Sequence, residues 1–191
     1  MGRVSELVSS QLRPQRADAR RNRERILAAA RAVFAATGVE AQIDDVARRA
    51  DVGVGTVYRH FPTKEALIEA LVRDHFAILA GFAQEAEQAP DAWEGFCAMV
   101  WRCAELNATV RGFSQVMGSS DKREIVAECG LFAATSALMR RAQAEGSMRP
   151  DAGPEDVAVL MCGHAGVAAT FPEPASWRRY LELMLDGLRA A

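Results

Sequence analysis

The chain has 191 residues, of which half are hydrophobic, and its formal net charge is −2 at pH 7. This length suits one domain, or a small domain joined to a larger one, and the apolar content is enough for a substantial core. No stretch approaches the ~18 consecutive apolar residues of a membrane span, and the Arg-rich N-terminus contains no hydrophobic signal segment, so we expect a soluble, cytoplasmic protein without a membrane partner.

The N-terminal end of the chain is basic. Residues 1–62 contain eleven arginines against seven acidic residues, whereas residues 63–191 contain twelve basic residues against eighteen acidic ones. Such an asymmetry suits a phosphate-backbone partner at the N-terminal end only, although a charge run is often just a solvated face. Residues 1–18 have no sustained apolar period, which predicts a flexible, basic arm.

Three helices are predicted after this arm. The first begins near Ala19 and ends before Gly38, a residue suited to a C-cap. The second covers residues 43–50, where apolar side chains follow an i, i+3, i+4, i+7 spacing and two aspartates occupy the first turn. After a tight turn, the third helix covers residues 54–60 and ends at Pro62, because proline cannot donate the next backbone hydrogen bond.

More helices follow, and no strand is predicted. Thr63 can cap a long helix with apolar residues on more than one face, and a polar break at residues 84–91 ends that helix. The remaining helical segments cover residues 92–107, 113–117, 121–145, 154–171 and 176–189. The sequence therefore predicts an all-α fold.

The first three predicted helices have the layout of a helix-turn-helix, in which the last helix enters the major groove of DNA. That groove admits a helix and presents a distinct pattern of donors and acceptors for each base pair. Val57 and Phe61 are expected to face inward and to hold the last helix in place. The alternative is that three short helices simply pack a core.

The residues of these helices favour the DNA-binding interpretation. The segments Ile43–Ala50 and 52–67 resemble the TetR family of bacterial regulators, and the order Gly-Thr-x-Tyr-x-His-Phe followed by a capped Lys-Glu-x-Leu helix is highly specific for that family. Beyond the DNA-binding segment only the helical architecture is similar. The resemblance implies an N-terminal three-helix DNA-binding domain with a helix-turn-helix over residues 19–65, followed by an α-helical ligand-binding and dimerisation domain over residues 66–191.

The resemblance assigns DNA contacts to the third helix. Val54, Gly55 and Thr56 would open this helix and face DNA, with Thr56 able to donate to a phosphate and to place its methyl group against a thymine methyl. Tyr58 and His60 would reach phosphates or base edges.

Residues beside this helix complete the expected interface. Lys64 would contact the DNA backbone as a point charge, and Arg59 can either bind a guanine or a phosphate or remain exposed at the flank. Gln42 stands where many family members have Ser or Thr as a helix cap; glutamine is a poorer cap but can still reach a phosphate or a base. Asp51 occupies a turn position often held by glycine, and aspartate tolerates the left-handed conformation better than most residues.

A homodimer is expected, because a single recognition helix reads too few bases for useful specificity. The last two predicted helices are apolar over much of their surface, and small residues on the first of them would let a second helix approach closely. The resemblance suggests a four-helix interface between two subunits, whereas burial within a monomer is the alternative. The expected interface residues are Cys162, Ala165, Ala169, Trp177, Tyr180, Leu181, Met184 and Leu188.

Family members usually sense a small molecule in the helical domain, so the resemblance implies a small apolar effector in addition to a double-stranded DNA operator. The expected lining consists of Phe96, Val100, Phe113, Met117, Phe132, Thr135, Met139 and His164. Aromatic residues and methionines at helical spacing are more often plain core, and a lone histidine in an apolar stripe is usually hydrogen-bonded there. The preferred hypothesis is a sequence-specific repressor that a small-molecule ligand in the C-terminal helical domain releases from its operator; a DNA-binding regulator without a ligand, with a filled core, is the alternative.

The sequence argues against an enzyme. It shows no paired carboxylates on a shared helical face, no Gly-rich phosphate loop and no metal-ligand spacing. The four cysteines, Cys97, Cys103, Cys129 and Cys162, form no CxxC pair and lie in apolar helical patterns, so we expect buried, reduced thiols. We therefore expect no catalytic residue, no metal and no cofactor.

Overall fold

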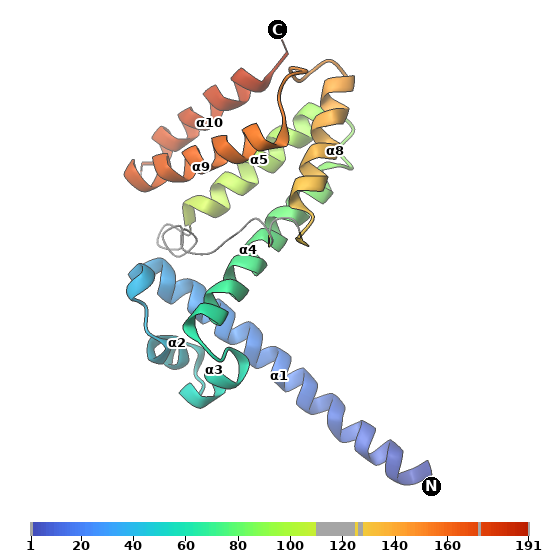
Figure 1. Cartoon of the computed structure of the whole chain (residues 1–191), viewed down its shortest axis with the longest axis vertical. Helices are drawn as coiled ribbons and strands as arrows, with labels where there is room; N and C mark the ends of the chain where they lie inside the picture. The colour runs from blue at the N-terminus through green and yellow to red at the C-terminus, as the bar shows by residue number, and fades with distance from the viewer. Residues whose placement is uncertain (1, 110–124, 126–127, 172, 191) are drawn as a thin grey trace. The chain divides into compact units, whose positions relative to one another are not determined.

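The computed structural model describes residues 2–109, 125, 128–171 and 173–190, and these residues form α-helices and one short 3-10 helix with no strand among them (Figure 1). The chain divides into two compact units, Met1–Leu71 and Val72–Ala191. No helix in the described ranges is long and apolar enough to cross a lipid bilayer.

The first unit contains four helical elements and the start of a fifth. They are α1 (Gly2–Thr37), η1 (Gly38–Glu40), α2 (Ile43–Ala50), α3 (Val54–His60) and α4 (Lys64–Ala86), the last of which continues into the second unit. The bounds of α2 and α3 confirm the sequence-based prediction. The helical start near Ala19, after a flexible arm, is not what the structure shows, since α1 begins at Gly2. The Arg, Glu, Leu and Gln residues of this segment have good helix propensity, and extending an existing helix costs little.

A small core holds the first unit together. Ile26, Ala30 and Phe34 follow one another at four-residue spacing on α1, and all three are fully buried. α1 packs against α2, which packs against α3, and the most deeply buried side chains of these two short helices are Val46 and Val57. Short helices of this kind are marginal alone, so their stability comes from this packing.

The ends of these helices are set by local chemistry. Gly38 (φ 61°) ends α1 in the left-handed conformation that glycine adopts without steric cost. Asp51 (φ 52°) does the same after α2, and its backbone N–H donates to the carbonyls of Ala47 and Arg48. The Thr63 hydroxyl accepts a hydrogen bond from the N–H of the residue three positions on at 3.1 Å, which confirms the predicted cap of α4.

The second unit contains the rest of α4 together with α5 (Ala92–Thr109), α8 (Leu131–Ala144), α9 (Pro154–Thr170) and α10 (Pro174–Leu188). α5 packs against α8 and α9, and α9 packs against α10 (Figure 1). Their buried residues form one apolar core.

The predicted helix over residues 121–145 is wrong as a single element. Gly130 has φ 76°, and α8 begins directly after it. A left-handed residue cannot continue a right-handed α-helix, so the chain turns here. The predicted short helix over residues 113–117 lies outside the described residues.

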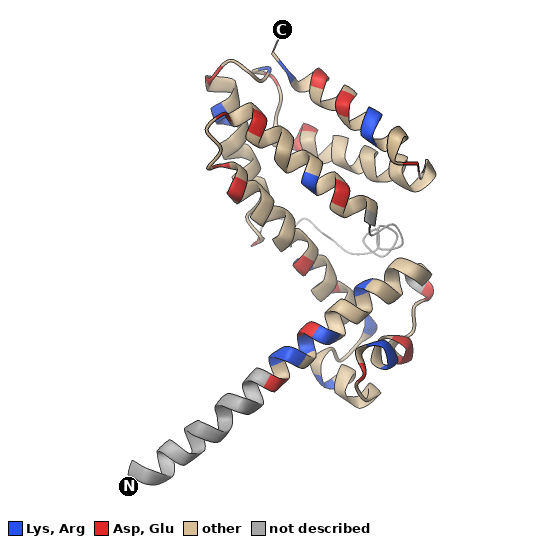
Figure 2. Cartoon of the chain, turned by 180° about the vertical axis from the view of Figure 1, so that it is seen from behind, with Lys and Arg blue, Asp and Glu red and all other residues tan. Residues whose placement is uncertain are grey.

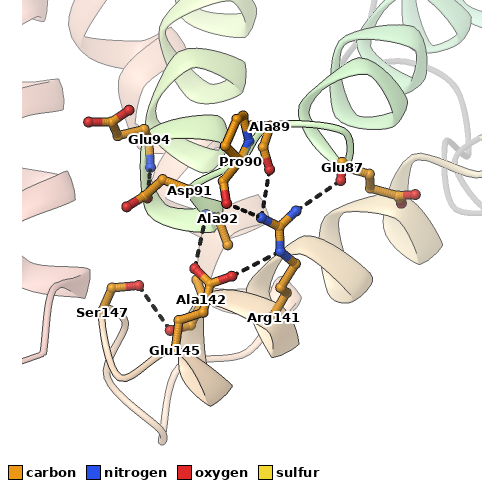
Figure 3. A network of polar contacts seen from close by, with 10 residues as sticks. All are labelled: Glu87, Ala89, Pro90, Asp91, Ala92, Glu94, Arg141, Ala142, Glu145 and Ser147. Carbon is orange, nitrogen blue, oxygen red and sulfur yellow. Dashed lines mark hydrogen bonds and ion pairs between the residues drawn. The ribbon is translucent and has the colours of Figure 1, made fainter.

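One polar network fastens α8 to the connection between α4 and α5 (Figure 3). The Arg141 guanidinium donates to the backbone carbonyls of Glu87, Ala89 and Pro90 at 3.0, 2.6 and 2.8 Å. It also pairs with Glu145 at 2.9 Å, and the other oxygen of that carboxylate accepts the first N–H of α5 at 3.0 Å. One side chain of α8 thus holds the end of α4, and its partner caps the start of α5.

Candidate nucleic-acid interface

α3 is a short helix with one buried side and one exposed side. Val57 is fully buried and Phe61, directly after the helix, is 4% exposed, so both hold α3 against the core as predicted. On the other side, Val54 is 36% exposed and Tyr58 is 47% exposed. Apolar and aromatic side chains that do not pack on their own domain are available for a partner.

Arg59 lies along α3. Its Nη2 donates to the Thr56 hydroxyl at 2.9 Å and its Nε donates to the carbonyl of Gly55 at 3.3 Å. Arg59 and Gly55 are exposed, whereas Thr56 and His60 are half-buried. The Thr56 hydroxyl accepts from Arg59 and keeps its own hydrogen for a further acceptor. Arg59 is therefore bonded to two other residues of α3 and not to the core of the unit.

The glycines at the front of α3 leave its surface open. A Cβ built on Gly53 or on Gly55 would meet no atom within 4 Å. Neither residue has a left-handed φ, so the fold does not require glycine at these positions. A glycine within a helix lowers helix stability by about 1 kcal/mol relative to alanine. Gly55 is therefore unfavourable for the helix itself, but its lack of a side chain allows a partner to come close to the backbone.

The flanking candidates differ in how they are held. Gln42 is exposed and makes no side-chain cap on α2; its Nε2 donates to the carbonyl of Glu40 at 2.8 Å instead. This absence agrees with the expectation that glutamine is a poor cap. The Nζ of Lys64 lies 5.9 Å from the centre of the Phe34 ring, so this cation stands at the start of α4 beside the core of the unit.

Two arginines of α1 reach the helix-turn-helix and were not singled out from the sequence. Arg25 donates to both the carbonyl and the carboxylate of Asp51, each at 3.3 Å. The Arg23 guanidinium lies over the ring of Phe61, 5.6 Å from its centre. The sequence signal was the run of arginines in this segment, but only the fold shows which of them stand beside α3.

Comparisons with known proteins agree with this geometry over both units. Residues 26–71 match the family model of bacterial regulatory proteins of the tetR family, and residues 88–190 match that of the C-terminal domain of SbtR-like transcriptional regulators. The chain belongs to the TetR family. It is therefore a DNA-binding transcriptional regulator, with a helix-turn-helix unit followed by an all-helical one.

Solved structures of TetR regulators resemble the whole chain. SCO0520 from Streptomyces coelicolor is 33% identical with a TM-score of 0.70, and the match covers 88% of this chain and 99% of that one. A TetR regulator from Mycobacterium vanbaalenii is 32% identical with a TM-score of 0.69, over 93% of this chain and all of that one. The repressor KstR from Mycolicibacterium smegmatis is 51% identical over 57 residues, which is 29% of this chain. The chain spans only 28% of the length of that curated relative.

The predicted effector residues of this TetR protein fall into three groups. Phe96, Val100, Thr135 and Met139 are buried in the second unit, and Phe132 is 41% exposed. Phe113 and Met117 lie outside the described residues, and the eighth candidate, His164, is buried. A groove of about 510 Å³ lies along α9 and α10, and residues such as Leu160, Leu183 and Met184 border it. None of the six candidates that the structure describes lines this groove.

His164 differs from the other candidates. It is fully buried on α9, and neither ring nitrogen has a hydrogen-bond partner within the described part of the chain. Its ring meets that of Trp177 edge-on at 5.4 Å and 88°. Burial lowers the pKa of His164, which keeps the imidazole neutral. A buried polar ring without a hydrogen-bond partner lowers the stability of the folded chain, so burial of His164 is unfavourable unless a ligand supplies that partner.

The predicted dimer residues separate by helix. Trp177, Leu181, Met184 and Leu188 of α10 are buried in the core of their own unit, so they are not a free surface in this chain. Tyr180 is half-buried, and its hydroxyl donates to the carbonyl of Leu160 at 3.2 Å. α10 is amphipathic, and its apolar side covers α5 and α9.

α9 provides exposed apolar surface, and Leu183 of α10 is 54% exposed as well. Cys162 and Ala169 are exposed and Ala165 is half-buried, while Val159, outside the predicted set, is 71% exposed. Some small residues of α9 serve packing within the chain. A Cβ on Gly163 would lie 2.5 Å from the Tyr180 hydroxyl, so glycine is required for this close approach.

The cysteines are free thiols, but they are not all buried as predicted. Cys103 is buried, Cys97 and Cys129 are half-buried, and Cys162 is exposed. The exposed one lies on the side of α9 that α10 does not cover, which the helical pattern alone could not reveal. Burial raises the pKa of Cys97 to about 11 and that of Cys103 to about 12, so both stay protonated at neutral pH. Where the structure describes side chains, no group of three His, Cys, Asp or Glu residues could hold a metal ion.

Proposed function

We propose that this TetR-family chain is a dimeric, sequence-specific repressor that leaves its operator when a small apolar effector binds the C-terminal unit. The observation that carries the DNA-binding part is the exposed side of α3, where Val54 and Tyr58 stand free of the core while Val57 anchors the helix. A helix of this kind enters the major groove with its first residues against base edges.

Four residues of α3 and two beside it have a named role in this proposal. Tyr58 reaches a phosphate or a base edge, and the methyl group of Thr56 meets a thymine methyl. Arg59 moves from Thr56 to a guanine or a phosphate when DNA arrives. Gly55 lets the duplex approach, because nothing in the chain itself occupies the space in front of it. Lys64 and Gln42 add contacts to the DNA backbone at the two flanks.

The dimer is proposed through α9. One face of this helix carries four residues spaced three or four positions apart, namely Val159, Cys162, Gly166 and Ala169. All four are exposed in the single chain. A second copy that covers this face would place two recognition helices on neighbouring half-sites of DNA. Val159→Arg, which adds a charge to this face, is expected to yield monomers by analytical ultracentrifugation, while an unchanged dimer would reject α9 as the interface.

The effector is proposed to bind beside His164. An apolar compound with one hydrogen-bonding group would satisfy a buried imidazole that lacks a partner among the described residues. The compound would lower DNA affinity only through its differential affinity for the two states of the dimer. α4 is the expected lever, because it carries residues of both units.

The test begins with a mobility-shift assay on operator duplexes selected from random DNA. We expect Tyr58→Ala or Arg59→Gln to weaken binding about 5- to 150-fold, the range of one lost base contact of about 1 to 3 kcal/mol. Arg140→Gln, an exposed change on α8, is the matched control and should bind as the parent does. The DNA-binding part of the proposal fails if the unaltered protein shows no sequence preference at low salt.

A screen of apolar compounds with a polar head group then tests the effector. Release of the operator by one compound, with loss of that response in His164→Phe, is the expected result. A protein that binds its operator and responds to no compound would instead be a regulator with a filled core, in line with the burial of Phe96 and Val100.

A further inference from the structure

A basic part of α1 borders the recognition helix at both ends. Arg25 is hydrogen-bonded to Asp51 in the turn before α3, and the Arg23 guanidinium lies over Phe61, the residue directly after α3. Arginines, drawn in blue, are frequent on this part of α1 (Figure 2). The part of α1 that carries Arg23 and Arg25 therefore lies beside α3 within the first unit.

Arg23 differs from its neighbours in how its charge is balanced. Arg20 pairs with Glu24, Arg21 with Asp18 and Arg25 with Asp51. For Arg23 the side chains described by the structure provide an aromatic ring and no carboxylate. A ring holds the planar guanidinium in place and leaves its full positive charge and its N–H donors available.

We propose that Arg23 binds a phosphate of the DNA backbone next to the C-terminal end of the recognition helix. This rests on the proposed DNA binding by α3, and it adds a contact from a helix outside the helix-turn-helix. A guanidinium fits a phosphate with two parallel hydrogen bonds, and Phe61 holds Arg23 in position before DNA arrives. Together with Lys64 on α4, this places a cation from each of two helices near the end of α3.

The contact would position the helix and would not read sequence. Phosphate contacts fix register and orientation on the duplex without carrying base information. Arg23 should therefore strengthen binding to an operator and to an unrelated duplex by the same factor. Its contribution should also depend on salt, because each neutralised phosphate releases condensed counterions.

The experiment measures DNA affinity at several salt concentrations, on the operator and on a scrambled duplex, with the full chain. Arg23→Gln is compared with Arg21→Gln, which removes the same charge from the same helix but from an arginine already paired with Asp18. We expect Arg23→Gln to reduce the slope of log affinity against log salt by about 0.9 for each bound protomer. The slope of Arg21→Gln should match that of the parent.

Arg23→Lys and thermal unfolding of all variants separate charge from folding. The lysine variant should keep the slope of the parent with somewhat weaker binding, because the charge remains while the planar fork is lost. An unchanged slope in Arg23→Gln, or an equal reduction in Arg21→Gln, would overturn the proposal. Since a phosphate contact is present on any duplex, the slope on scrambled DNA reports on Arg23 even if the protein prefers no operator.

Discussion

The strongest structural prediction concerns Arg141, which connects α8 to the end of α4 and the start of α5 (Figure 3). Replacing it with glutamine removes donors from three backbone carbonyls, those of Glu87, Ala89 and Pro90. It also leaves Glu145 without its ion-pair partner, although that carboxylate keeps the first N–H of α5. We expect the second unit to lose stability and the DNA-binding surface of the first unit to stay as it is.

The magnitude follows from how the lost bonds are exposed. The bonds to Glu87 and Ala89 are partly buried, while the bond to Pro90 and the pair with Glu145 face solvent. A partly buried hydrogen bond to a charged group contributes about 1 to 1.5 kcal/mol after allowance for solvent, and exposed pairs contribute little. The free energy of unfolding should therefore fall by about 2 to 3 kcal/mol.

Urea unfolding at one fixed protein concentration measures this change, because dimerisation would make the midpoint depend on concentration. Arg140→Gln is the matched control, since the neighbouring arginine is exposed and removing it takes away the same charge. A loss in Arg141→Gln no larger than in Arg140→Gln would refute the view that this network holds α4, α5 and α8 together.

Three further outcomes are expected. Gly95→Ala should lower the free energy of unfolding in urea by about 1 to 3 kcal/mol, because the new Cβ would lie 2.8 Å from a backbone carbonyl at the end of α4. Gly81→Ala is the control and should not destabilise the protein, since the space around Gly81 is open. Equal effects of the two changes would contradict this reasoning. Burial lowers the pKa of His164, so the unfolded chain takes up a proton at this residue as the pH falls through 6.5 while the native chain does not. The free energy of unfolding should therefore drop below that pH, and His164→Phe should abolish this contribution to the drop. Identical pH profiles of stability in both proteins would exclude a lowered pKa of His164. Burial raises the pKa of Cys103 to about 12, so this thiol should resist iodoacetamide at pH 8 until urea unfolds the protein. Mass spectrometry measures the labelling. Labelling at the same rate in the folded and unfolded states would show that Cys103 is not buried.

The sequence by itself determined the first unit in detail. The bounds of α2 and α3, the left-handed turn at Asp51, the stop at Pro62 and the cap at Thr63 are all set by residues within a few positions of one another. Such signals depend on local backbone chemistry, so they can be found without knowledge of the fold. The same holds for the inward side of α3, because Val57 is the residue that its short helical period leaves buried.

Where local signals were weak, the sequence was less informative. Gly130 stood in a continuous helical pattern, and a single glycine inside such a pattern does not reveal whether its φ is positive. The start of α1 had no apolar period to mark it, so the sequence predicted no helix there.

Only the tertiary structure decided which neighbour covers each apolar surface. Helical spacing shows that Trp177 and Leu181 share an apolar face, but the fold shows that this face packs on its own unit and that Val159 on α9 and Leu183 on α10 are left exposed. The same reason applies to His164, whose ring nitrogens have no hydrogen-bond partner among the described residues, and to Arg23, which meets Phe61 across 38 positions of the chain. Periodicity records the direction of a side chain around its own helix, and the contacts that give that side chain a function come from elements far away in the sequence.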